Sequence, residues 1–198
     1  MKQNQEQNQA DPRYLLANIA KILKRLKIPY IITGGMAVLL WGRPRFTADI
    51  DIVIELKEKH IDKLEVALRE LGEAGYIDKD MIVEALKNNG EFNFIDGDSG
   101  VKVDFWVMEN SVFDLSRMKR GVFEKIFGEM VCFSSPEDLI LIKLLWAKKS
   151  PSTRQIEDVQ SILKISGKKI DKNYLKLWAG KLGIFEYLNG MIDENKIQ

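Results

Sequence analysis

Residues 30–56 read YIITGGMAVLLWGRPRFTADIDIVIEL. The apolar run at 30–33 is typical of a short buried strand. It is followed at once by Gly34-Gly35 and by an apolar segment, 36–41, that predicts a helix. Glycines between a strand and a helix let the backbone approach a ligand closely. Their N–H groups and the start of the helix attract phosphate, so this segment predicts a phosphate-binding turn.

A second strand is predicted at 48–56, which alternates at its start and is rich in Ile and Val. Residues two apart in a strand lie on the same face, so Asp49 and Asp51 project together. Two adjacent carboxylates repel each other, and a divalent cation between them makes the arrangement favourable. Magnesium prefers hard oxygen ligands of this kind, so the pair predicts a magnesium site.

The strand predicted at 101–107 supplies a third carboxylate, Asp104. Its apolar face includes Phe105, and Asp104 lies on the opposite face with Lys102. If this strand pairs beside 48–56, three carboxylates converge. They can then hold two metal ions roughly 3.5–4 Å apart, the spacing used in phosphoryl transfer. The alternative for Asp104 is an ordinary surface pair with Lys102.

The rest of the chain alternates helices and strands as far as about residue 135 and is helical beyond it. Helices are expected at 11–28, 59–72, 78–88, 110–119, 136–148, 153–165, 171–182 and 184–192, and further strands at 91–95, 123–127 and 130–133. These elements predict an α/β (α+β) fold with a small mixed sheet and flanking helices. We expect a disordered tail at 1–10, a catalytic core at 11–135 and a helical subdomain at 136–198.

The composition argues against several kinds of site. The 198 residues carry a net charge of +1, so no overall field indicates a nucleic-acid or membrane partner. The one cysteine, Cys132, is expected to be a small buried hydrophobe, and the one histidine, His60, is expected at the exposed start of a helix. With one histidine and one cysteine, the chain has very few of the residues from which a Ser-His-Asp triad or a zinc site is built.

The chain carries no recognisable targeting segment. Its N-terminus, MKQNQEQNQ, lacks the apolar core of a signal peptide, and no apolar run approaches the length of a membrane span. A cytoplasmic protein is therefore expected.

The order of these motifs carries a family resemblance. Thr33-Gly34-Gly35 followed by Asp49-Ile50-Asp51 resembles the signature of the DNA polymerase β-like nucleotidyltransferase superfamily. Within it, the chain most resembles small nucleotidyltransferases related to the AbiEii abortive-infection toxins, over roughly residues 15–165. The matching segments are Gly34-Gly35-Met36-Ala37-Val38-Leu39, Thr47-Ala48-Asp49-Ile50-Asp51, Pro136-Glu137-Asp138-Leu139, Lys143, and Arg154 to Asp158-Val159.

The resemblance implies transfer of a nucleoside monophosphate from an NTP, such as ATP, to an acceptor hydroxyl with release of pyrophosphate. Asp49, Asp51 and Asp104 would bind two magnesium ions, with manganese as a substitute, and Asp104 would act as general base. The nucleotide would be held by Thr33, Gly34, Gly35, Arg43, Arg45 and Lys143.

Several charged residues have two interpretations. Arg43 and Arg45 fit a solvated loop as well as triphosphate binding. Lys143 either extends to solvent from an apolar helix face or reaches the nucleotide phosphates, and the resemblance favours the second role. Arg154 and Asp158 are four residues apart, and they either form only an exposed ion pair or belong to the site.

The acceptor and the biological role stay open at this point. RNA, a protein, and a small molecule such as an aminoglycoside or lincosamide antibiotic are the candidate acceptors. The chain is alternatively the toxin of a toxin–antitoxin pair with an antitoxin as partner, or a catalytically silent module that binds a nucleotide or another partner. A homodimer through apolar residues of the last helices is one option for the oligomeric state.

Overall fold

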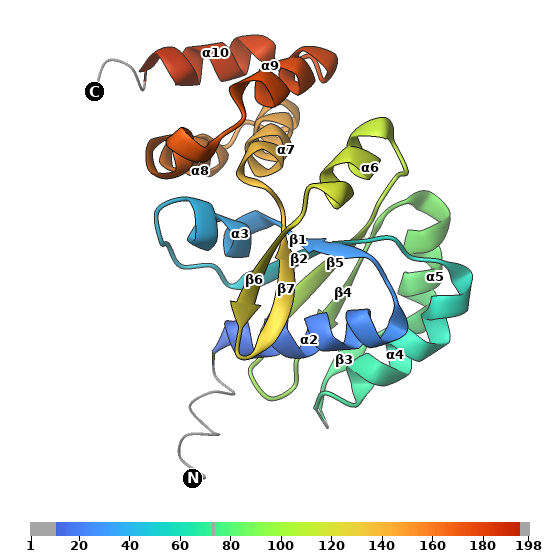
Figure 1. Cartoon of the computed structure of the whole chain (residues 1–198). Helices are drawn as coiled ribbons and strands as arrows, with labels where there is room; N and C mark the ends of the chain where they lie inside the picture. The colour runs from blue at the N-terminus through green and yellow to red at the C-terminus, as the bar shows by residue number, and fades with distance from the viewer. Residues whose placement is uncertain (1–10, 73, 195–198) are drawn as a thin grey trace. The chain divides into compact units, whose positions relative to one another are not determined.

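The computed structural model describes residues 11–72 and 74–194, so the tail predicted at 1–10 lies outside the described residues. The chain divides into two compact units, each built from two segments. Unit 1 comprises Met1–Thr33 and Thr47–Phe133, and unit 2 comprises Gly34–Phe46 and Ser134–Gln198. Unit 1 holds the strands, and unit 2 is helical (Figure 1).

In the described part of unit 1, seven strands form one mixed sheet in the order β3-β4-β5-β2-β1-β7-β6. The strands are β1 (Tyr30–Ile32), β2 (Asp49–Ile54), β3 (Tyr76–Ile77), β4 (Glu91–Ile95), β5 (Lys102–Val107), β6 (Val122–Ile126) and β7 (Glu129–Phe133). β2 pairs with β5 and β1 with β7 in parallel, and the other pairs are antiparallel. The mixed sheet predicted from the sequence is confirmed, and β3 is an addition that the sequence did not predict.

The helices of unit 1 pack against this sheet. They are α2 (Pro12–Leu26), the short 3₁₀ helix η1 (Glu58–His60), α4 (Ile61–Arg69), α5 (Lys79–Asn88) and α6 (Val112–Lys119). α2 begins as predicted, because the Asp11 carboxylate accepts a hydrogen bond from the Arg13 N–H at 2.9 Å and Pro12 occupies the first helical position. Figure 1 shows α2 and α4 lying side by side along the sheet.

One face of the central strands forms the core of unit 1. Ile50, Ile52 and Ile54 of β2 are fully buried on this face. In register with them, Phe105 of β5 is also fully buried, and its ring stacks on Phe92 with the centroids 4.9 Å apart. Burial of this face fixes which side chains of β2 and β5 lie on the other one.

The opposite face carries a small apolar cluster of Ile31, Val53, Met108 and Cys132, against which Trp106 packs. Cys132 is buried, as predicted, and this burial raises the pKa of its thiol to about 11. Buried and partly buried residues alternate along β5, and Trp106 is one of the partly buried residues that pack on this face. The cluster closes this face of the sheet beyond the polar end of β2.

Unit 2 consists of helices whose described members are α3 (Gly34–Trp41), α7 (Pro136–Lys149), α8 (Thr153–Ser166), the 3₁₀ helix η2 (Gly167–Lys169), α9 (Lys172–Lys181) and α10 (Phe185–Glu194). Ser135 caps α7, because its hydroxyl accepts from the Asp138 N–H at 3.2 Å. The Trp41 indole N–H donates to the Ser134 carbonyl at 2.8 Å and ties α3 to the start of α7. No helix in residues 11–72 and 74–194 is long and apolar enough to cross a membrane.

His60 departs from the sequence prediction. The side chain was expected to be exposed at the start of a helix, but the residue is buried, and its Nδ1 accepts a hydrogen bond from the Lys57 N–H at 3.2 Å. The tight η1 turn places the His60 ring against the backbone N–H of Lys57. A helical sequence pattern does not reveal this contact. Burial, with Lys59 and Lys57 nearby, lowers the pKa of His60 below its ordinary value of 6.5.

We expect His60 to stabilise the fold only while it is neutral. Its contribution is complete above pH 6.5 and is lost as pH falls through the lower pKa of the folded state, because the unfolded chain then binds the proton more readily. His60 is the only histidine, so one imidazole signal in a proton NMR titration reports this pKa directly. A value at or above 6.5 would contradict the prediction.

Candidate active site

Three predicted carboxylates lie on one face of the sheet in unit 1. β2 and β5 run parallel with Asp51 directly opposite Asp104 and Asp49 opposite Lys102. All four side chains are only partly buried, in contrast to their fully buried neighbours along both strands. The parallel pairing thus places the residues predicted for a metal site on adjacent strands, at the same level and on the same face.

Lys102 is the positive charge within this group. Its Nζ lies 2.8 Å from Oδ2 of Asp104. The hydrogen bond with Asp104 raises the pKa of Lys102, and the nearby charge of Asp49 contributes in the same direction. The ammonium group therefore offsets part of the repulsion between the carboxylates.

The chemistry of the donor set fits a magnesium ion that a substrate helps to hold. In residues 11–72 and 74–194, no group of three or more His, Cys, Asp or Glu side chains is arranged to hold a metal ion. Magnesium is commonly bound through one or two carboxylates, with substrate phosphates and water completing its shell. Asp49 and Asp51 supply such oxygens, and Asp104 is engaged by Lys102.

Thr33 directly follows β1 and lies opposite Asp51. Its N–H donates to the Asp51 carbonyl at 2.9 Å, which continues the antiparallel register of β1 and β2 and places the two residues opposite each other. The Thr33 side chain is buried, and within the described residues its hydroxyl has no hydrogen-bond partner. A buried hydroxyl left unsatisfied costs about 1–3 kcal/mol, which a polar ligand on this face would offset.

Gly34 and Gly35 open α3 in unit 2, directly after Thr33 in the chain. Gly34 adopts a φ of 57°, in the left-handed region that side-chain-bearing residues rarely occupy. Both glycines are buried. The turn into α3 therefore needs glycine at its first position, and the first N–H groups of the helix are the kind that attract an anion.

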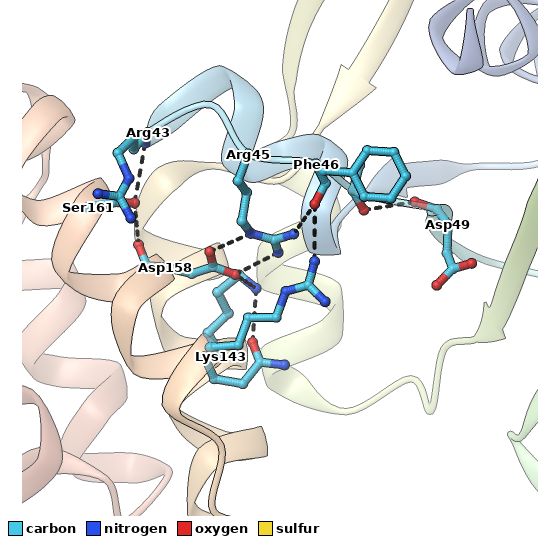
Figure 2. A network of polar contacts seen from close by, with 10 residues as sticks. Arg43, Arg45, Phe46, Asp49, Lys143, Asp158 and Ser161 are labelled. Atoms are coloured by element: carbon cyan, nitrogen blue, oxygen red, sulfur yellow. Dashed lines mark hydrogen bonds and ion pairs between the residues drawn. The ribbon is translucent and has the colours of Figure 1, made fainter. Parts of the chain in front are cut away.

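A buried ion network occupies unit 2, centred on Asp158 of α8 (Figure 2). Asp158 accepts two hydrogen bonds from Arg45, both of 2.8 Å, and Nζ of Lys143 lies 2.7 Å from its Oδ2. Lys143 and Asp158 are only 1% and 3% exposed. Lys143 also donates to Gln155 at 2.9 Å. A lysine on an apolar helix face is thus satisfied inside the unit and does not extend to solvent.

The carboxylate of Asp158 lies between two cations. Burial alone would raise the pKa of Asp158, but hydrogen bonds from Arg45 and Lys143 outweigh it and lower the pKa. Two cations thus share one ionised carboxylate. Arg45 and Arg154 also donate to the Phe46 carbonyl, at 3.0 and 3.1 Å. This concentration of donors and positive charge is suited to attract an anion.

The structure corrects two interpretations of these charged residues. Of the two interpretations of Arg154 and Asp158, the exposed ion pair does not form, because Asp158 is buried and Arg45, from a loop more than a hundred residues earlier, binds its carboxylate with two hydrogen bonds. Arg45 is therefore not a solvated loop residue. Arg43 is exposed, and its backbone N–H donates to the Ser161 hydroxyl at 3.3 Å (Figure 2).

The sequence matches the family described as "Nucleotidyl transferase AbiEii toxin, Type IV TA system" over residues 15–183. This span includes the carboxylates of unit 1 and the ion network of unit 2. No curated protein matches the chain significantly.

Solved structures of nucleotidyltransferases share the fold. ANT(2″)-Ia, solved in complex with adenylyl-2″-tobramycin, is 18% identical with a TM-score of 0.57 and covers 86% of this chain and 96% of its own. The lincomycin-bound lincosamide adenylyltransferase LnuA is 15% identical with a TM-score of 0.51, covering 73% and 92%. An antigenic nucleotidyltransferase-like protein from Paracoccidioides brasiliensis is 21% identical with a TM-score of 0.50, covering 76% and 74%.

Removing Asp158 should destabilise the protein more than removing Lys143. Asp158→Asn leaves the buried Lys143 without the carboxylate that neutralises it, and we expect a loss of about 3–5 kcal/mol in the free energy of unfolding. Lys143→Met leaves Asp158 paired with Arg45, so a loss of only about 1–2 kcal/mol is expected. Urea denaturation followed by tryptophan fluorescence measures both. The reverse order would contradict a network centred on Asp158.

Proposed function

This chain belongs to the AbiEii family of nucleotidyl transferases and is a nucleotidyltransferase, and we propose that it moves a nucleoside monophosphate from an NTP to an acceptor hydroxyl in a magnesium-dependent reaction. The observation that carries the proposal is the register of β2 and β5, in which Asp51 and Asp104 lie opposite each other with Asp49 on the same face. Carboxylate oxygens on adjacent strands can hold metal ions next to a reacting phosphate, where the ions stabilise the attacking and leaving oxygens of phosphoryl transfer.

In the proposed reaction, the acceptor oxygen forms a bond to the α-phosphorus of the NTP. The bond from that phosphorus to the bridging oxygen breaks, and pyrophosphate leaves with the bonding electrons. The proton of the acceptor hydroxyl passes to a carboxylate oxygen of Asp104, which acts as general base. When bound, magnesium would be held by Asp49 and Asp51 and would neutralise charge that develops on the phosphate oxygens.

The remaining predicted residues have proposed roles in holding the nucleotide. The N–H groups of Gly34 and Gly35 would bind the β- and γ-phosphates, which the left-handed conformation of Gly34 and the start of α3 support. Lys143 and Arg45 would contribute positive charge toward the phosphates, and the fixed position of both side chains beside Asp158 supports this role. The unsatisfied hydroxyl of Thr33 supports a polar ligand beside Asp51.

The acceptor and the biological role are further parts of this proposal. The family description names a toxin of a type IV toxin–antitoxin system, which supports a toxin role and an antitoxin partner for this chain. ANT(2″)-Ia, which was solved with adenylyl-2″-tobramycin, and the lincosamide adenylyltransferase LnuA have a similar fold and support a small-molecule acceptor as the second candidate. The two candidates differ in where a transferred nucleotide appears.

Asp51→Asn should abolish nucleotide transfer while leaving the protein folded, because it removes a proposed metal ligand from a half-buried position. We expect a loss of at least about 10³-fold, since such electrostatic groups contribute several kcal/mol to the transition state. The measurement incubates the protein with each α-labelled NTP, magnesium, and separate pools of RNA, soluble protein and antibiotics. Label in one pool names the acceptor class.

The matched control is Asp62→Asn, which removes an exposed carboxylate on α4, remote from β2 in the same unit. This variant should transfer as the wild type does. In growing cells, the wild type should arrest growth and Asp51→Asn should not, if the toxin role holds. Full transfer activity in Asp51→Asn would refute the mechanism.

Lys102→Met should strengthen magnesium binding. The ammonium group occupies Asp104 and lies near Asp49, so it competes with a cation for the same carboxylates. Because a partly exposed ion pair of this kind is worth about 0.5–1 kcal/mol, a roughly two- to fivefold lower dissociation constant is expected. Manganese titration followed by paramagnetic relaxation measures the change. Weaker binding in the variant would show that Lys102 supports the site instead of competing for it.

A further inference from the structure

Positive charge is unevenly divided between the two units. Unit 1 contains 17 basic and 21 acidic residues, whereas unit 2 contains 13 basic and 8 acidic residues, although the whole chain is nearly neutral at +1. Three of the acidic residues in unit 2, namely Glu137, Asp138 and Asp158, are buried. The accessible surface of unit 2 is therefore more basic than its sequence suggests.

The exposed lysines of unit 2 gather on its C-terminal helices. Among the described side chains the exposed lysines are Lys148, Lys149, Lys164, Lys168, Lys169, Lys172, Lys176 and Lys181, while the exposed acids are Glu157, Asp171 and Glu186. Asp171 caps α9, since its carboxylate accepts from the N–H groups of Asn173 and Tyr174, both at 3.0 Å. One of the few acids on this surface is thus already engaged by the backbone.

Lys164, Lys168 and Lys172 surround one pocket. They line a hollow of about 290 Å³ whose apolar surface includes Leu163, Leu175 and Ile192. Within the described part of the chain, none of the three lysines forms an ion pair with an acidic side chain. The pocket therefore combines an apolar floor with a rim of uncompensated positive charge.

We propose that this surface of unit 2 binds single-stranded RNA. The lysines extend beyond the pocket, with Lys176 one turn along α9 from Lys172, and this arrangement suits a chain of phosphates better than a single anion. The apolar floor suits an unstacked base or sugar, which a single strand exposes and a duplex does not.

RNA binding does not depend on the proposed transfer reaction, because it is measured without NTP or magnesium. The experiment follows the fluorescence anisotropy of a short labelled single-stranded RNA of mixed sequence over a range of salt concentrations. The test variant is Lys164→Gln/Lys168→Gln/Lys172→Gln. The control is Lys59→Gln/Lys63→Gln/Lys87→Gln, which removes the same charge from exposed positions on unit 1.

We expect wild type and control to bind RNA with the same steep salt dependence. In the test variant, affinity should fall at least tenfold. The slope of log K against log salt should become shallower by about 2, because each phosphate that a lysine no longer neutralises changes the slope by about 0.7. Competition with duplex DNA and with anionic vesicles identifies the preferred partner. Equal losses in both variants, no RNA binding by the wild type, or stronger competition by either competitor than by unlabelled RNA would overturn the proposal.

Discussion

The parallel register of β2 against β5 is the constraint on which the candidate site depends. Isoleucines of β2 and apolar residues of β5 share one buried face. The residues that alternate with them, Asp49, Asp51 and Asp104, therefore lie on the other face. A slip of one residue would turn Asp51 or Asp104 into the core and expose the isoleucines. Burying an unpaired carboxylate in this way would strongly destabilise the fold. The core thus keeps Asp49, Asp51 and Asp104 on one face of the sheet despite their like charges, and Lys102 offsets part of their repulsion.

In unit 2, basic side chains are held in place around a buried acid. The buried carboxylate of Asp158 contacts Lys143 of α7 and Arg45 of the α3–β2 connection. Such a centre joins segments that are far apart in the sequence, because a buried charge tolerates few positions for its partner. It also keeps the two cations fixed in place. Both units therefore organise charge through packing, one around acids and the other around bases.

Sequence reasoning reached the helices, the mixed sheet and the face of the carboxylates, because periods of two and of 3.6 are properties of neighbouring residues. It failed where the answer depends on distant ones. The partner of Asp158 is Arg45 and not the nearby Arg154, and a helical spacing cannot reveal a bidentate bond across more than a hundred residues. His60 was misplaced because a 3₁₀ turn has no apolar period, and β3 is too short to show one. Metal binding and the nucleotide contacts stay predictions, because they depend on molecules that the chain alone does not contain.

The buried thiol of Cys132 has a practical consequence. Burial raises the pKa of this thiol to about 11, so it stays almost entirely protonated near neutral pH, and the thiolate is the reactive form. Since Cys132 is the only cysteine, the native chain should be almost silent toward maleimides. A cysteine introduced at any exposed position would therefore take up a fluorophore or spin label selectively, with no need to remove the natural one. Site-specific fluorescence and spin-label measurements therefore need only one substitution in each variant.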